Sequence, residues 1–285
     1  MAENNSDRNG RALEYILCVE LDKLPNYNLT PQAQRLNARD KDKFLSLPHN
    51  LQTDYISATP SICNWINNYF SNTNNASVDR LNDTPDDPSD VIITDANKKL
   101  SISLKHNHEA LKHPRPYSFA QACGYQKGTN EDLYYRNFMT SATNNFRTMI
   151  KNKTRFNQCP STAIDKLYLD VCLACKQSID FWKTTDNNLP SHLFKFLVGN
   201  GFYKVIVETT KNCVNVKAQD FLTIPIPTSV NTKVNANRLI LEFNNGWILN
   251  LRIHTASSEI STAPNQLSLK FDAQKDVGLI NEFNI

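Results

Sequence analysis

A short segment in the first half of the chain constrains the fold more than any other. An acidic stretch ends at Asp90, an apolar triplet follows at 91–93, and after a polar turn the chain returns through 100–105. Apolar and polar residues alternate in the returning segment, so one face of a strand carries Leu and Ile and the other carries Ser103 and Lys105. The pattern predicts two antiparallel strands that place Asp90 beside Ser103 and Lys105.

An aspartate and a lysine at the end of a small sheet suit the hydrolysis of a phosphodiester. The carboxylate of Asp90 is a suitable ligand for Mg²⁺. The ammonium group of Lys105 can orient or deprotonate a water molecule and offset the charge that grows at phosphorus. The alternatives are an ordinary aspartate at a strand entrance and a solvated lysine at a strand end.

A basic segment continues from the second strand. Residues 98–115 contain five Lys or Arg, three His and one acidic residue, although the net charge of +3 alone does not indicate nucleic-acid binding. The candidate DNA contacts here are His106, Asn107, His108, Lys112 and Arg115. The alternative is a solvated polar surface.

A second hairpin is predicted near the C-terminus. Strands are expected at 239–243 and 247–254, and Asn244-Asn245-Gly246 between them is a typical hairpin turn. One face of the second strand is apolar, and the other presents the candidate DNA contacts Asn250, Arg252 and His254. Arginine can read guanine with two hydrogen bonds, whereas Lys270, a further candidate, suits phosphate.

Several phrases in the sequence resemble a known family. They are "GRALEY" at 10–15, "SISLKHNHEALKH" at 101–113, "NNGW" at 244–247, "RIHTASS" at 252–258 and "LKFD" at 269–272. In this order they resemble type II restriction endonucleases of the HaeIII kind, with a nuclease core of the PD-(D/E)xK class. The resemblance implies Mg²⁺-dependent cleavage of double-stranded DNA at a short G·C-rich palindrome, GGCC.

The resemblance also assigns roles to residues. Asp90 becomes the metal-binding acid, and Ser103 stands where the common motif has an acid two residues before the lysine, Lys105. Since a serine hydroxyl brings no charge to a metal, a carboxylate from elsewhere is needed. We expect Glu14 on the first helix to be that second metal ligand, with Asp86 and Asp87 as alternatives. The other interpretation of Glu14 is a first-turn acid favoured by the helix dipole.

The expected fold class is α/β, with a PD-(D/E)xK-type core, a helical N-terminal part and a β-rich C-terminal portion. We expect a disordered lead at 1–9 and a single nuclease domain at 10–285, with DNA-recognition elements in 190–285. Helices in 28–70 are expected to break near Pro48 and Pro60.

The 7 cysteines are odd in number and irregularly spaced. Cys172 and Cys175 have the spacing of a zinc or redox pair, but they fall in a stretch with helical periodicity and have no second ligand pair, so we expect two small core residues. Free thiols favour a reducing compartment. The first residues lack an apolar signal segment, and no stretch is long enough to span a membrane. Together with the resemblance, these features imply a bacterial cytoplasmic enzyme.

A palindromic site must be cut on both strands, so we expect either a homodimer or a monomer that nicks the strands in sequence. A DNA methyltransferase that protects the host site is expected as a genetic partner only. Two other functions remain open. One is a sequence-specific DNA-binding protein with an inactive nuclease core, which Ser103 favours, and the other is a repair or structure-directed nuclease.

Overall fold

The computed structural model describes residues 5–71, 73, 75–81, 88–107, 111–210, 213–263 and 266–285. The chain divides into two compact units that alternate along the sequence. Unit 1 comprises Met1–Glu109, Gly199–Ile224 and Ile280–Ile285, and unit 2 comprises Ala110–Val198 and Pro225–Leu279. The chain leaves the first sheet, builds a second body and then returns to the first sheet.

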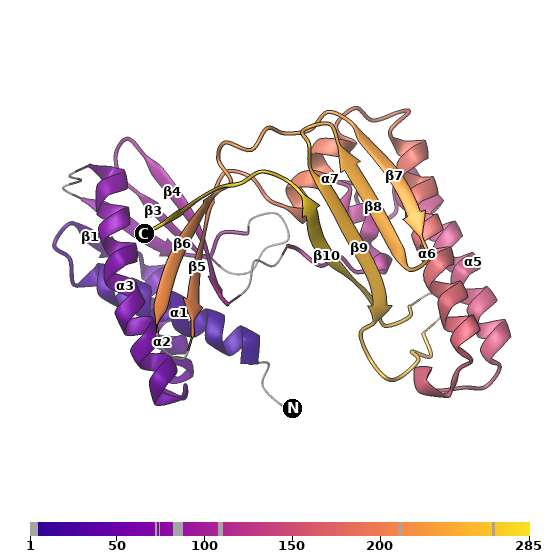
Figure 1. Ribbon diagram of the computed structural model, residues 1–285, viewed down its shortest axis with the longest axis horizontal. Helices are drawn as coiled ribbons and strands as arrows, with labels where there is room; N and C mark the ends of the chain where they lie inside the picture. The colour runs from indigo at the N-terminus through magenta and orange to yellow at the C-terminus, as the bar shows by residue number, and fades with distance from the viewer. Residues whose placement is uncertain are drawn as a thin grey trace. The chain divides into compact units, whose positions relative to one another are not determined.

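Unit 1 is a mixed sheet with three long helices (Figure 1). Its helices are α1 (Asn5–Asp22), α2 (Pro31–Leu45) and α3 (His49–Phe70). Its strands are β1 (Tyr27–Leu29), β2 (Ala76–Arg80), β3 (Val91–Thr94), β4 (Lys99–His106), β5 (Tyr203–Thr209), β6 (Val214–Asp220) and β11 (Asn281–Asn284), in the order β1-β2-β3-β4-β5-β6-β11.

Strand directions in this sheet are mixed. Strands β2, β3 and β4 are antiparallel neighbours, whereas β5 joins β4 in parallel and β1 joins β2 in parallel. One face of the sheet, including Val91, Ile102 and Val205, packs against apolar side chains of α1 and α3 such as Leu13 and Ile62. The apolar residues that alternate along the predicted hairpin therefore belong to this core, as expected.

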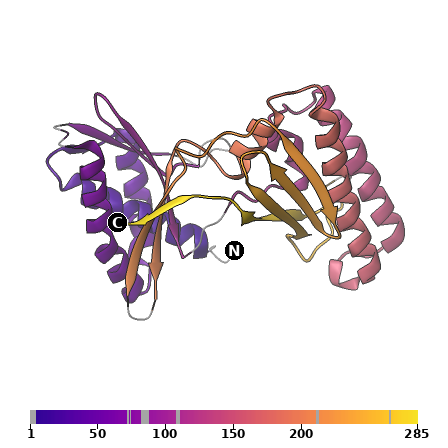
Figure 2. The same ribbon diagram turned by 45° about the horizontal axis from the view of Figure 1, so that its top comes forward.

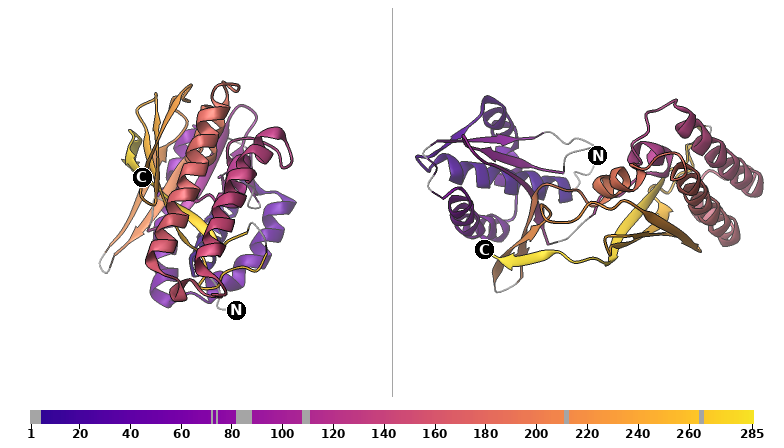
Figure 3. Two further views of the ribbon diagram at one scale, coloured as in Figure 1. Left: turned by 90° about the vertical axis from the view of Figure 1, so that its right-hand side faces the viewer. Right: turned by 90° about the horizontal axis from the view of Figure 1, so that it is seen from above.

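Unit 2 contains a helical layer and a four-stranded antiparallel sheet. Its helical elements are η1 (Pro116–Ser118), α4 (Phe119–Ala122), α5 (Asn130–Ile150), η2 (Phe156–Gln158), α6 (Ser161–Trp182) and α7 (Leu189–Leu197). Its strands are β7 (Val230–Asn235), β8 (Arg238–Phe243), β9 (Ile248–Thr255) and β10 (Leu269–Val277), in the order β10-β9-β8-β7. Helices α5 and α6 lie side by side, and α6 packs against β7 and β8 (Figures 2 and 3).

The expected elements are largely present. The hairpin around 90–105 and the strands near 239–254 are confirmed, with Gly246 at φ +86° in the turn between β8 and β9. Helix α1 starts at Asn5, so part of the lead expected at 1–9 is helical. The mixed α/β class is confirmed.

The prediction that a helix breaks near Pro60 was wrong. Pro48 does precede the first residue of α3, but Pro60 lies inside this helix. A proline within a helix leaves the carbonyl four residues earlier without its usual donor. Here that carbonyl, on Ile56, accepts a hydrogen bond from the Thr59 hydroxyl at 3.0 Å. The helix continues because the lost donor is replaced locally.

None of the helices that the structure describes is long and apolar enough to cross a membrane.

Candidate active site

Asp90 lies at the entrance to β3, where pairing with β4 fixes its position. The register sets Val91 opposite Ile102, and the Asp90 amide donates to the Ile102 carbonyl at 2.8 Å. The Asp90 side chain therefore points to the face of β4 that carries Ser103 and Lys105. The sequence predicted this proximity.

Three donors converge on one oxygen of Asp90. Its Oδ2 accepts hydrogen bonds from the backbone amide of Leu104 at 2.7 Å, the Ser103 hydroxyl at 3.2 Å and the Lys105 ammonium at 3.3 Å. The other oxygen, Oδ1, meets no donor among the described residues. The carboxylate is thus oriented by its own hairpin through this one oxygen.

Ser103 is buried, with only 1% of its surface exposed. Its hydroxyl is directed at Asp90. The Ser103 hydroxyl therefore helps to orient the Asp90 carboxylate. By contrast, Lys105 keeps 26% of its side chain exposed, so its ammonium group can reach solvent as well as Asp90.

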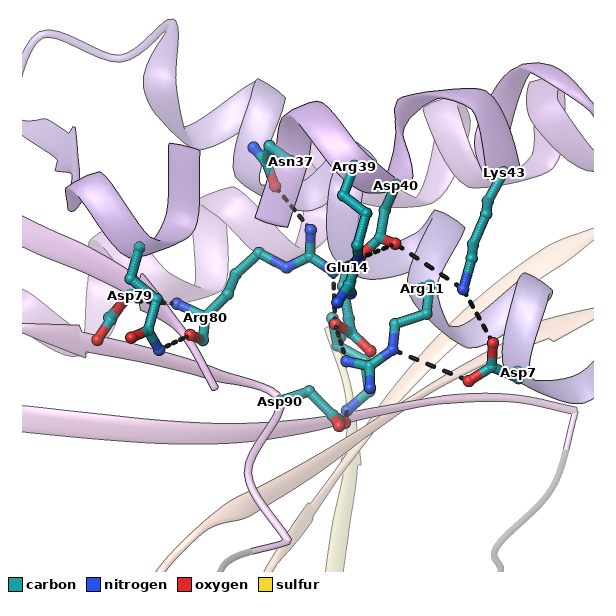
Figure 4. A network of polar contacts seen from close by, with 12 residues as sticks. Asp7, Arg11, Glu14, Asn37, Arg39, Asp40, Lys43, Asp79, Arg80 and Asp90 are labelled. Carbon is teal, nitrogen blue, oxygen red and sulfur yellow. Dashed lines mark hydrogen bonds and ion pairs between the residues drawn. The ribbon is translucent and has the colours of Figure 1, made fainter. Parts of the chain in front are cut away.

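Glu14 lies on α1 and is 4% exposed. Its Oε2 accepts from Arg80 Nη2 at 2.6 Å and from Arg11 Nη1 at 3.3 Å (Figure 4). Burial and then the charge of Asp90 raise the pKa of Glu14, while Arg80 and Arg11 act in the opposite direction. Asp90 is thus one of the charges that act on Glu14.

Arg80 at the end of β2 is fully buried and was not foreseen as a functional residue. Its guanidinium donates to Glu14, to Asp40 Oδ2 at 2.9 Å and to Asn37 Oδ1 at 2.9 Å (Figure 4). A signal existed in the sequence, because residues 76–80 alternate and Arg80 shares the buried face with Ala76 and Val78. An arginine on the apolar side of a strand needs buried acceptors.

Asp90 and Glu14 supply only two carboxylates, so a metal ion held here would take its other ligands from water or substrate. Among the described residues, no three His, Cys, Asp or Glu side chains are grouped to hold a metal ion. Mg²⁺ usually retains several waters and binds one or two carboxylates together with substrate phosphate. The carboxylates of Asp90 and Glu14 fit such an ion. The alternatives Asp86 and Asp87 fall outside the described residues.

The candidates after β4 have structural partners. His106 Nε2 and Thr209 Oγ1 share a hydrogen bond at 3.0 Å, and the His106 ring meets the edge of Tyr55. Asn107 donates to Thr209 Oγ1 at 3.1 Å and accepts from the Thr209 amide at 2.7 Å. These contacts join the ends of β4 and β5. His108 falls outside the described residues.

Lys112 and Arg115 belong to unit 2. The Lys112 ammonium lies 4.9 Å from the centre of the Phe196 ring, and its amide donates to the Leu197 carbonyl at 3.0 Å. Arg115 is exposed, and its carbonyl accepts from the Ser118 amide at the start of η1.

Two side chains on the polar face of β9 lie beside Asp272 on β10. Arg252 Nη2 lies 3.1 Å from Asp272 Oδ2, and His254 Nε2 lies 3.1 Å from Asp272 Oδ1. Burial tends to raise the pKa of Asp272, but Arg252 and His254 outweigh it, so this pKa lies below its usual value. Asn250 accepts from Arg238, and Lys270 sits opposite His254 in the pairing of β9 with β10. Buried and accessible residues alternate along β9 as predicted.

The pair Cys172 and Cys175 lies on α6, buried and free of disulfides, as expected for core residues. Burial raises the pKa of Cys172 to about 12.

Comparison with known proteins gives a family. A search of curated proteins finds no match. The family model described as HaeIII restriction endonuclease matches residues 78–224, which include Asp90, Ser103 and Lys105 but not Glu14 or the β9 face. The match covers more than half of the chain and confirms the resemblance seen in its motifs. This chain belongs to the HaeIII restriction endonuclease family.

Proposed function

We propose that the protein is a type II restriction endonuclease that hydrolyses double-stranded DNA with Mg²⁺ at a short G·C-rich palindrome, GGCC, between G and C. The observation that carries the proposal is the convergence of Ser103, Leu104 and Lys105 on one oxygen of Asp90. This cluster lies inside the segment that matches the family.

We assign unit 1 to the PD-(D/E)xK class of nuclease cores. Three antiparallel strands, β2 to β4, followed by the parallel strand β5 support this assignment, as does the helix α1 against the sheet. We take the acid at the start of β3 and the lysine on β4 as the motif of this class.

Within this site, Asp90 and Glu14 would hold the metal ion. Bound Mg²⁺ supplies charge neutralisation at phosphorus and a more acidic water. Ser103 and the Leu104 amide keep Asp90 oriented. The Lys105 ammonium donates to the attacking water or to a phosphate oxygen, because it is exposed enough to reach both.

Recognition of the target falls to unit 2 in this proposal. Arg252 reads a guanine, Asn250 and His254 contact neighbouring base edges, and Lys112, Arg115 and Lys270 contact phosphates. Binding requires Arg252 to exchange Asp272 for DNA, which its 46% exposed side chain permits. His106, Asn107 and His108 complete the proposed contact set. The hydrogen bonds of His106 and Asn107 to Thr209 leave less of these two side chains for DNA.

The protein acts on both strands as a homodimer or by sequential nicking, in the bacterial cytoplasm, with a DNA methyltransferase as its genetic partner.

A non-cleaving DNA-binding protein is the second candidate, since Ser103 contributes no negative charge to the metal site. A plasmid digest with Mg²⁺, followed by sequencing of the ends, separates the possibilities. Discrete bands with GGCC ends support the proposal, whereas an uncut plasmid favours the non-cleaving protein and a smear favours a nuclease with little sequence preference. A parallel digest in excess chelator must show no cleavage, because the proposed mechanism needs the metal ion.

A further inference from the structure

Arg80 links the candidate metal site to two helices. It is fully buried, as is its partner Asp40, and the side chain of Glu14 is 5% exposed. A single nitrogen, Nη2, donates to both Glu14 and Asp40, while Nη1 donates to Asn37. These acceptors come from α1 and α2, and Arg80 itself comes from β2.

The far side of this cluster is fixed as well. Arg39 binds Asp40 through two hydrogen bonds, Nε to Oδ1 at 2.9 Å and Nη2 to Oδ2 at 2.7 Å. Asp40 therefore cannot turn without breaking a paired interaction on both sides. The contacts run in series from Arg39 through Asp40 and Arg80 to Glu14 (Figure 4).

We propose that Arg80 is a positioning residue of the metal site, which fixes the Glu14 carboxylate beside Asp90 through the short bond from Nη2. The proposal rests on the proposed function, because it takes Asp90 and Glu14 as the acids that receive the metal ion.

The charges explain why such a residue is needed. Glu14 and Asp90 carry like charges, and little water reaches Glu14 to screen them. Lys105 compensates Asp90 at 3.3 Å, and Arg80 compensates Glu14 at 2.6 Å. Arg11 also contacts Glu14, but at 3.3 Å. Arg80 holds the closer position and, being tied to α2, does not move with α1 alone.

A contribution to folding stability does not by itself explain the buried ion pairs of Arg80 with Glu14 and Asp40. Buried ion pairs lose much of their attraction to desolvation, and apolar residues of similar volume often serve as well. The location of the cluster against the acids of the site indicates a role in chemistry. Partners that orient metal-binding carboxylates typically change metal affinity by about 10–100-fold when they are mutated.

The test measures Mn²⁺ binding to the whole protein without DNA, by electron paramagnetic resonance of the free ion. We expect Arg80→Lys, which keeps the charge but loses the forked geometry, to weaken Mn²⁺ binding by about 10-fold. Glu14→Gln should weaken it similarly. The double variant should lose little beyond either single variant, because both changes remove one interaction.

Arg136→Lys is the matched control. Arg136 also forms a 2.6 Å ion pair with a buried acid, Asp132, but in unit 2. The Arg136→Lys variant should bind Mn²⁺ with the same affinity as the wild type. If Arg80→Lys does not fold, Asn37→Ala removes the Nη1 acceptor with all charges kept, and it should weaken Mn²⁺ binding in the same direction.

Wild-type affinity in the folded Arg80→Lys variant, or in Asn37→Ala where Arg80→Lys does not fold, would overturn the proposal. Fully additive losses in the double variant, or a wild-type protein that binds no Mn²⁺, would overturn it as well. A wild-type protein that binds Mn²⁺ but never cuts DNA would remove the proposed function and leave the role of Arg80 to be decided by the same affinities.

Discussion

The two units use charged residues in opposite ways. In unit 1 the ion pairs of Arg80 with Glu14 and Asp40 are buried, and every partner is held by several contacts. In unit 2 the ion pair of Asp272 with Arg252 lies on an accessible sheet face, where 46% of the Arg252 side chain is exposed.

The difference separates two tasks. A buried pair has no competing partner and keeps its geometry, which suits a site where a metal ion and a phosphate must meet fixed acids. An exposed pair is weak, because water and salt screen it, so its members can exchange each other for DNA. Under the proposed function, unit 1 holds the acids in a fixed geometry, and the β9 face of unit 2 exchanges its ion pair for contacts with DNA.

Of the changes that we predict, replacing Asp90 or Lys105 should have the largest effect, which is on the rate of DNA cleavage. Asp90→Ala should abolish cleavage, and Lys105→Ala should slow it by about 10²–10³-fold, because a preorganised charge at the reacting phosphate is lost. Rates on plasmid DNA measure this, with Lys99→Ala on the same strand as the control. An Asp90→Ala variant that still cut at a wild-type rate would remove this residue from the site.

The two kinds of ion pair should also differ in stability. Arg80→Met removes the buried cation that Glu14 and Asp40 share, and we expect it to lower the free energy of unfolding by about 3–5 kcal/mol. Arg252→Ala should change it by no more than about 1 kcal/mol. Chemical denaturation of both variants measures the contrast, and equal losses would contradict the distinction between the units.

Two residues of unit 2, Arg252 and Lys112, should affect DNA affinity in different ways. Arg252→Ala should weaken binding to a GGCC duplex by about 1–3 kcal/mol and binding to a scrambled duplex by less. Lys112→Ala should weaken both equally and reduce the salt slope by about one unit, as expected for a lost phosphate contact. Salt titrations on the two duplexes give both values. Equal losses on both duplexes for Arg252→Ala would assign this residue to the DNA backbone.

We expect the smallest effect in the dependence of folding stability on acidic pH. Burial tends to raise the pKa of Asp40, but Arg39, Arg80 and Lys43 outweigh it, so this pKa lies below its usual value. The folded state therefore binds the Asp40 proton more weakly than the unfolded state, and stability present at neutral pH is lost as pH falls below about 4. Asp40→Asn should lower stability at neutral pH and flatten its decline in acid. A decline as steep as that of the wild type would exclude Asp40 as a contributor.

Local patterns in the sequence predicted the β3–β4 hairpin and the proximity of its polar residues well. Alternation at 100–105 fixes the faces of β4, and the short turn fixes the pairing that brings Asp90 to Ser103 and Lys105. The β8–β9 hairpin followed from the same two signals, alternation and a turn with glycine.

Long-range features were not accessible in this way. Nothing local in residues 76–80 reveals that Arg80 will meet Glu14 and Asp40, which lie 66 and 40 residues away. The division into two units likewise depends on β5 and β6 returning to the first sheet. Asp272 was part of a family phrase, but its bond to Arg252 needed the register of β9 and β10.

The parallel pairing of β4 with β5 has a consequence for how the protein folds. These adjacent strands are separated in sequence by residues 107–202, so their contact closes a very long loop. Such contacts are made late and slow the folding rate, although the entropy of closure grows only slowly with loop length. Until β5 arrives, the N-terminal hairpin has an unpaired β4 edge that can pair with another chain. Nascent or partly unfolded protein is therefore most exposed to aggregation along the strand that carries Ser103 and Lys105.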